Sequence, residues 1–114
     1  MSDCLFCKII AGEIPAKKIY EDDHVFAFED INPQAPVHYL IIPKQHIATI
    51  NDLDSSHEAL LGKMYLAAQQ LAEQSGIAED GYRAVMNCGA AAGQTVFHIH
   101  LHLLGGRPLS WPPG

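Results

Sequence analysis

The chain has 114 residues, 48% hydrophobic and 18% charged, which is typical of a globular protein and long enough for one domain over residues 1–114. Its seven Lys and Arg against thirteen Asp and Glu give a formal net charge of −6, which argues against a nucleic-acid polymer as partner. No apolar run reaches the roughly 20 residues of a membrane span, and no signal peptide is recognisable, so we expect a cytoplasmic protein without membrane contact.

The first part of the chain predicts a short helix followed by a hairpin. A helix over CLFCKIIA, residues 4–11, would be capped by Asp3 and ended by Gly12. Strand patterns at 17–20 and 24–29 are separated by a turn-like EDD segment. A proline-containing loop at 31–36 then precedes a third strand, VHYLIIP, over residues 37–43.

The second part predicts one long helix and two more strands. Ser55 and Glu58 have the spacing of a capping box, and apolar residues then recur with helical period as far as Gly76. Strands at 82–87 and 95–104 flank the small-residue loop CGAAAGQ. These elements predict an α+β domain with a five-stranded antiparallel sheet, whose helices we expect to cover one face.

The segment TVFHIHLHLL, residues 95–104, places three histidines at alternate positions. Alternation in a strand would direct His98, His100 and His102 to one face and the apolar residues, Phe97 among them, to the core. The histidines could be structural, metal-ligating or catalytic. At roughly 3.3 Å per residue, the outer two would have Cα atoms about 13 Å apart, too far for one ion to bind all three. His100, in the middle, is the candidate nucleophile, because a neutral imidazole attacks phosphorus or acyl carbon well.

The loop before the histidines has the composition of an oxyanion site. In NCGAAAGQT, the glycines, Gly93 among them, allow the backbone to approach a ligand closely. Asn87, Gln94 and Thr95 add side-chain donors to the backbone N–H groups, which suits a phosphate. Such loops are more often simple turns, so this motif is weak without the histidines.

The His-x-His-x-His motif followed by two apolar residues resembles the signature of the histidine triad superfamily of nucleotide hydrolases and transferases. The segments FEDINPQAPVHYLIIPKQHI, GQTVFHIHLHLLGGR and WPPG extend the resemblance over nearly the whole chain, to the branch of histidine triad nucleotide-binding proteins that are purine nucleoside phosphoramidases. The resemblance implies a homodimer with a continuous ten-stranded sheet. It also implies that purine nucleotides are the ligands and that catalysis needs no cofactor.

In this family the middle histidine, matching His100, attacks the α-phosphorus of a nucleoside 5′-phosphoramidate, such as AMP-NH2 or AMP-lysine. The resulting nucleotidyl-histidine is hydrolysed to the nucleoside monophosphate. His38 matches a fourth histidine, which helps to orient the nucleophile. Positions matching phosphate contacts are Asn87, Gln94, Thr95, His98 and His102; Thr95 replaces a more frequent serine but keeps the hydroxyl.

The resemblance also implies contacts to the nucleoside. Asp30 matches an acidic residue that accepts hydrogen bonds from the ribose hydroxyls. Positions matching the apolar walls around the base, which the pattern alone would assign to the core, are Phe6, Ile9, Phe28, Ile31 and Leu40. The tail over residues 105–114 matches a segment whose tryptophan, Trp111, reaches toward the partner subunit's site.

Cys4 and Cys7 form a C-x-x-C pair, to which two further ligands would add a tetrahedral metal site. Three cysteines, counting Cys88, cannot all pair in disulfides, so we expect reduced thiols or metal ligands. Some relatives bind structural zinc through residues that match Cys4, Cys7, His46 and His98. Alternatively, the pair is two small apolar side chains of the first helix. His98 could therefore contact phosphate or bind zinc.

Three functional hypotheses besides phosphoramidase stay open at this point. The chain could be a dinucleoside polyphosphate hydrolase of the same superfamily, a nucleotide-binding adaptor whose hydrolysis is incidental, or a zinc-stabilised structural module. The sequence does not identify the amine that leaves, and it does not separate adenine from guanine.

Overall fold

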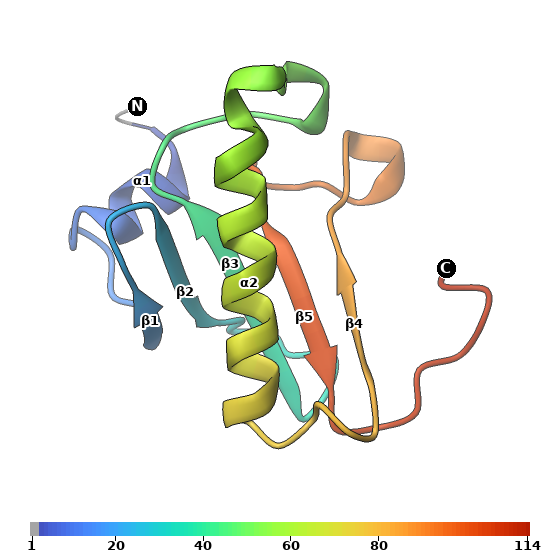
Figure 1. The fold of residues 1–114 in the computed structure, drawn as a ribbon. Coiled ribbons are helices and arrows are strands. Elements are labelled where there is room, and N and C mark those ends of the chain that lie inside the picture. Colours follow the sequence, from blue (N-terminus) through green and yellow to red (C-terminus); the bar gives the residue numbers. More distant parts are fainter. Residues whose placement is uncertain (1–2) are drawn as a thin grey trace.

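The computed structural model describes residues 3–114 as an α+β fold, in which five antiparallel strands follow the order β1-β2-β3-β5-β4 (Figure 1). The strands are β1 (Lys18–Glu21), β2 (Val25–Glu29), β3 (Val37–Pro43), β4 (Tyr82–Val85) and β5 (Leu101–Gly105). The helices are α1 (Leu5–Ile10) and α2 (Glu58–Gln74), and the short 3-10 turns are η1 (Ile50–Asp52), η2 (Ser55–His57) and η3 (Ala90–Ala92). The predicted sheet and helices are therefore confirmed.

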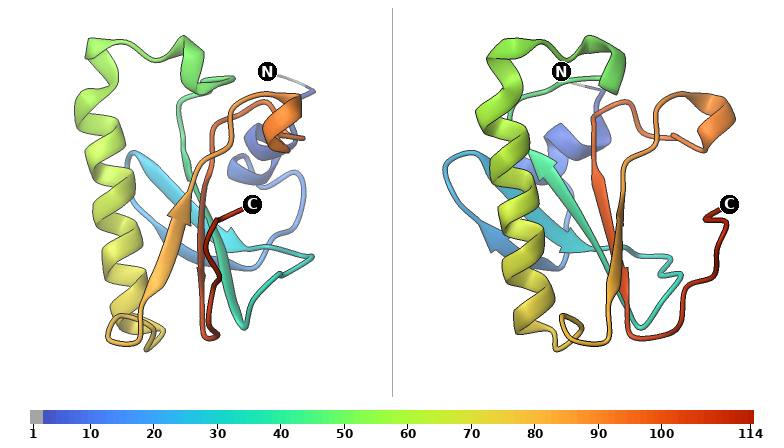
Figure 2. Two further views of the ribbon diagram at one scale, coloured as in Figure 1. Left: turned by 90° about the vertical axis from the view of Figure 1, so that its right-hand side faces the viewer. Right: turned by 45° about the vertical axis from the view of Figure 1, so that its right-hand side comes forward.

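The two helices cover opposite faces of the sheet, so the prediction that both lie on one face is wrong (Figure 2). Alternate residues of the central strands are apolar on both sides, and each side needs a cover. On one side, Val25, Ala27 and Ile41 pack with α2 in the larger core. On the other side, the smaller core joins α1 to β2 and β3, and its buried members are Cys4, Phe6, Ile9, Phe26, Phe28, Leu40 and Ile42.

Both helices begin differently from the prediction. Cys4, not Asp3, caps α1, because its Sγ accepts a hydrogen bond from the backbone N–H of Cys7 at 3.4 Å. The capping box predicted at Ser55 and Glu58 is absent. Instead, the side chain of Asp54 caps η2, and the backbone N–H of Asp54 donates in return to Nδ1 of His57 at 3.0 Å. Helix α2 continues directly from that turn.

Strand β5 starts at Leu101, although the pattern predicted a strand from residue 95. The preceding segment bonds to the connection after β3: the N–H of Ile99 donates to the carbonyl of Ile47 at 2.7 Å. These contacts replace a regular ladder and turn Phe97 outward, so it is 48% exposed instead of lying in the core. Ile99, Leu101 and Leu103 are fully buried, as alternation predicted.

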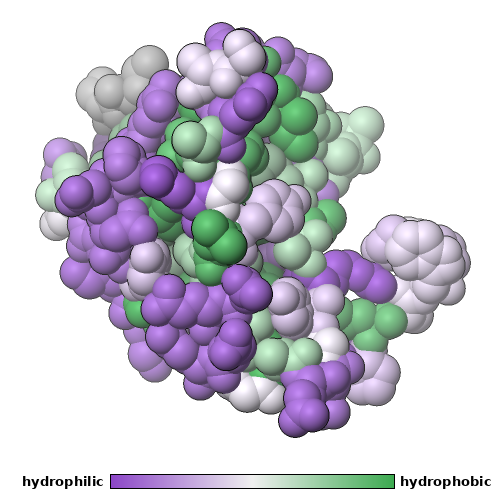
Figure 3. Space-filling model, in the orientation of Figure 1, coloured by the Kyte–Doolittle hydropathy of each residue, from purple (hydrophilic) through white to green (hydrophobic). Residues whose placement is uncertain are grey.

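The surface is mixed. In Figure 3, hydrophilic side chains predominate on the β1 side of α2, and hydrophobic surface shows between α2 and β4. No helix within residues 3–114 is both long enough and apolar enough to cross a lipid bilayer.

Candidate active site

Strand register places two histidines on the face of the sheet that α1 covers. In the β3–β5 pair, Leu40 lies opposite His102, and His38 lies opposite Leu104. Because residues two apart on a strand share a face, His38 and His102 lie on the same side as Leu40, a member of the smaller core. The fold thus brings together histidines 64 residues apart.

Hydrogen bonds determine which nitrogens of this pair carry protons. The backbone N–H of Gln34 donates to Nδ1 of His38 at 3.0 Å, so a neutral His38 must carry its proton on Nε2. That Nε2 lies 2.9 Å from Nδ1 of His102, to which it donates. His102 then has its own proton on Nε2. Burial, followed by the neighbouring His100 and His38, lowers the pKa of His102 to about 4, so the ring is neutral at pH 7.

Asp30 completes this chain. Its Oδ2 lies 3.4 Å from Nε2 of His38, and its Oδ1 accepts the backbone N–H of Asn32 at 2.9 Å. Asp30, His38 and His102 are close enough to be considered as a metal-binding group. The 2.9 Å separation of the two histidine nitrogens is that of a hydrogen bond, however, and is shorter than the roughly 3.4 Å between two nitrogens on a tetrahedral zinc. The group is therefore a hydrogen-bonded relay.

His100 lies next to this relay with its ring held in one tautomer. Its Nδ1 donates to the backbone carbonyl of His98 at 2.8 Å, which leaves Nε2 with a free lone pair. Burial lowers the pKa of His100 below its usual value, so the ring is neutral at pH 7. The ring packs perpendicular to Phe6, at 5.1 Å between centroids, and its centroid is 5.0 Å from that of His102. A neutral imidazole with a free Nε2 has the form that a nucleophile needs.

His98 belongs to a different cluster. Its Nε2 donates to the carbonyl of Pro43 at 2.8 Å, so its Nδ1 lone pair faces away from that carbonyl, toward Cys4, Cys7 and His46. Both nitrogens of this fully buried ring are thus engaged away from His102.

The four groups have the spacing of a tetrahedral zinc site. Zinc bonds of about 2.3 Å to sulfur and 2.1 Å to nitrogen imply edges of about 3.6 Å between sulfur and nitrogen and 3.4 Å between nitrogens. Nδ1 of His98 lies 3.4 Å from Sγ of Cys4, 3.6 Å from Sγ of Cys7 and 3.3 Å from Nδ1 of His46. Burial and the adjacent Cys4 raise the pKa of Cys7 to about 11, so the thiolate that zinc needs would form only with the ion's charge. The donor set and its spacing both fit zinc.

The loop between β4 and β5 offers fewer free donors than the sequence predicted. Its N–H groups at residues 89, 92, 93 and 94 are already bonded within the loop, where Gly93 adopts a left-handed conformation. The side chain of Gln94 accepts from Gly89 N–H and donates to the carbonyls of Ala48 and Val96, so it shapes the loop. Thr95 is exposed and Asn87 is half-buried, and these two side chains stay available to a ligand.

The positions predicted to surround a base divide into two groups. Phe6, Ile9, Phe28 and Leu40 are buried together in the smaller core. Ile31 is 95% exposed and packs against nothing there, and Trp111 in the tail is 81% exposed. Sequence reasoning missed the backbone groups of Gln34 and Pro43 that fix the histidine tautomers. No residue pattern marks them, because any amino acid presents a carbonyl and nearly all present an N–H.

Comparison with known proteins identifies the family to which this chain belongs. Residues 11–109 match the HIT domain. The chain is 57% identical over 107 residues to purine nucleoside phosphoramidase of Escherichia coli. The match covers 94% of this chain and 90% of that protein. It is 56% identical to a HIT family hydrolase from Legionella pneumophila, whose crystal structure superposes with a TM-score of 0.97 over 98% of this chain and 100% of that one.

A more distant structure, a histidine triad nucleotide-binding protein from Candida albicans, is 34% identical and has a TM-score of 0.83 over 96% of this chain and 83% of that one. The chain therefore belongs to the HIT (histidine triad) domain family and is an enzyme of the HIT superfamily.

Proposed function

We propose that this enzyme cleaves the P–N bond of purine nucleoside 5′-phosphoramidates through a nucleotidyl intermediate on His100. The observation that carries the proposal is the tautomer of that ring: Nδ1–H is held by the carbonyl of His98, and Nε2 is unprotonated. The similarity to purine nucleoside phosphoramidase of Escherichia coli supports the substrate class.

The reaction follows from these protonation states. Nε2 of His100 attacks the α-phosphorus, the P–N bond breaks, and the nitrogen takes a proton from solvent and leaves as a neutral amine. The water of the next step returns that proton to solvent. The Nε2–H of His102, oriented by His38 and Asp30, donates to a phosphate oxygen and stabilises its charge in the transition state. Water then hydrolyses the nucleotidyl-histidine, which releases the nucleoside monophosphate and returns His100 to its neutral form.

The other contacts to the nucleotide are part of the same proposal. Asn87 and Thr95 supply further donors to phosphate, and the loop shaped by Gly93 and Gln94 sets their position. The carboxylate of Asp30 accepts from the ribose hydroxyls. The residues that form the walls around the base are Phe6, Ile9, Phe28, Ile31 and Leu40.

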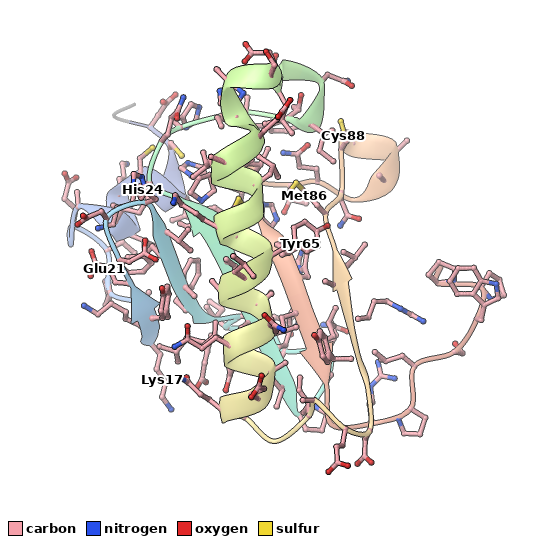
Figure 4. All side chains as sticks on the ribbon, viewed as in Figure 1. Lys17, Glu21, His24, Tyr65, Met86 and Cys88 are labelled. Carbon is pink, nitrogen blue, oxygen red and sulfur yellow. The ribbon has the colours of Figure 1, made fainter. Side chains whose placement is uncertain are left out.

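We also propose that the protein acts as a homodimer that pairs β4 with its counterpart. Within the described sheet, β4 has a neighbour on one side only, and an open edge is a template for pairing. Tyr82 on this strand and Tyr65 on α2 are 39% and 52% exposed. Figure 4 shows Tyr65 on the side of α2 nearest β4 and Met86. Pairing there would cover them and would bring the 105–114 tail, with Trp111, toward the partner's site.

Zinc has a structural role in this proposal. Cys4, Cys7, His46 and His98 would hold it, and it would fix α1 and the segment before β5 to the end of β3. Zinc supplies charge and rigid coordination there, while the chemistry at phosphorus uses only side chains of the chain.

The decisive comparison is turnover of adenosine 5′-phosphoramidate against a diadenosine polyphosphate. We expect the phosphoramidate to be the better substrate by kcat/KM; preference for the polyphosphate would favour the hydrolase alternative. His100→Asn should bind AMP but lose turnover, while His24→Asn, a matched change at the exposed β1–β2 turn (Figure 4), should retain it. AMP binding by the wild-type protein without turnover of either substrate would indicate a nucleotide-binding adaptor.

A further inference from the structure

Arg107 is tied to the loop that fixes the histidine relay. It lies just after β5, and its Nε and Nη2 both donate to the backbone carbonyl of Gln34, at 3.1 and 2.9 Å. Its Nη1 donates to the carbonyl of Pro108 at 2.9 Å, which fixes the guanidinium to its own segment. One exposed side chain thus joins the end of β5 to the loop at 31–36, which precedes β3.

A second contact holds the same two segments together. Gly106 has a φ of +92°, and a Cβ added there would lie 2.9 Å from Cβ of Pro36. The backbone before Arg107 is therefore packed directly on the loop, with no room for a side chain. Because the backbone next to Arg107 is held in place, the guanidinium has a fixed position relative to Gln34.

Gln34 is the residue that determines the tautomer of His38. Its backbone N–H donates to Nδ1 of His38, and this bond keeps the proton off Nδ1, so the His38 proton lies on Nε2, facing His102 and Asp30. If Gln34 moved away, Nδ1 of His38 could carry the proton instead. Nε2 of His38 would then become an acceptor, and Nδ1 of His102 would lose its donor.

We propose that Arg107 is a positioning residue for the reaction: by holding the Gln34 carbonyl, it keeps the Gln34 N–H on His38 and so keeps the Nε2–H of His102 directed at the substrate. This inference rests on the proposed function, since it assigns Arg107 a part in the step that His102 stabilises. Arg107 acts on the relay through Gln34 and makes no contact with the reacting atoms.

The test combines ring NMR with kinetics on the full chain. Arg107→Met keeps an unbranched side chain but removes every donor, and Lys63→Met removes one positive charge from α2, away from the loop. In wild-type protein near neutral pH, two-bond nitrogen–proton spectra should show His38 and His102 as Nε2–H tautomers. In Arg107→Met, His38 should become a mixture of tautomers, and kcat for adenosine 5′-phosphoramidate should fall about tenfold with little change in KM.

The controls separate positioning from folding. Lys63→Met should match wild type in both measurements, and Arg107→Lys, which retains one donating group, should give an intermediate kcat and a mainly Nε2–H His38. A pure Nε2–H tautomer of His38 in Arg107→Met would overturn the proposal. If Arg107→Met does not fold, a wild-type kcat and a wild-type spectrum in Arg107→Lys would overturn it. If wild-type protein shows no turnover, the proposed function fails, but the spectra still decide whether Arg107 sets the tautomer.

Discussion

Replacing His102 with Asn should make the fold less sensitive to acid. The Asn amide oxygen can still accept the hydrogen bond from His38, but it does not titrate. Burial, with the nearby His100 and His38, lowers the pKa of His102 from 6.5 to about 4. Between these values the unfolded chain binds a proton at this residue and the folded chain does not, so the free energy of unfolding falls as pH falls through this window.

The size of the effect follows from the same difference. At about 1.4 kcal/mol per pKa unit, the whole interval corresponds to about 3.5 kcal/mol. The ring is only partly buried, so solvent screening reduces this, and we expect about 1–2 kcal/mol.

Urea unfolding at about pH 7 and about pH 4.5 measures the effect, and the wild-type loss should exceed the His102→Asn loss by that amount. Groups that do not contact His102 contribute alike in both proteins, so their contributions cancel in the comparison. Equal losses would refute a buried neutral His102.

Three further predictions test the remaining parts of the structure. Gly106→Ala should lower the free energy of unfolding by about 1–3 kcal/mol, because Gly106 has a positive φ and lies close to Pro36. Gly62→Ala, in open space on α2, should raise it by about 0.5–1 kcal/mol. Equal stability of the two variants in urea would contradict the packing of Gly106 on Pro36. Purified protein should contain stoichiometric zinc by elemental analysis, and Cys7→Ser should lose the zinc and melt at a lower temperature. Wild-type protein that melts at the same temperature with and without metal would exclude the site. Sedimentation equilibrium should give twice the chain mass at micromolar concentration, and a monomer would refute pairing through β4.

Local patterns predicted the sheet well where local rules decide the structure. Alternation assigned Ile99, Leu101 and Leu103 to the core, and all three are buried there. The same rule failed at Phe97. The side chain of Gln94 bonds to the carbonyl of Ala48, after β3, and that of His98 bonds to the carbonyl of Pro43, the last residue of β3. Those partners lie about 50 residues away in sequence, so no local pattern predicts them.

The candidate site was predictable in residue type and only partly in geometry. Histidine spacing indicated a common site and a nucleophile, and the C-x-x-C pair indicated a metal. His98 faces the cysteines, whereas His102 faces His38. This difference depends on which backbone carbonyl or N–H bonds to the histidine rings of each group. Since backbone groups are nearly identical at every residue, their positions come from the fold alone.

The proposed mechanism requires that His100 become covalently attached to the nucleotide. Rapid quenching of the enzyme with adenosine 5′-phosphoramidate, followed by intact-mass measurement and peptide mapping, tests it most directly. The wild-type protein should carry an added AMP group on His100 that is absent from His100→Asn. An adduct on another residue, or undiminished turnover by His100→Asn, would contradict it.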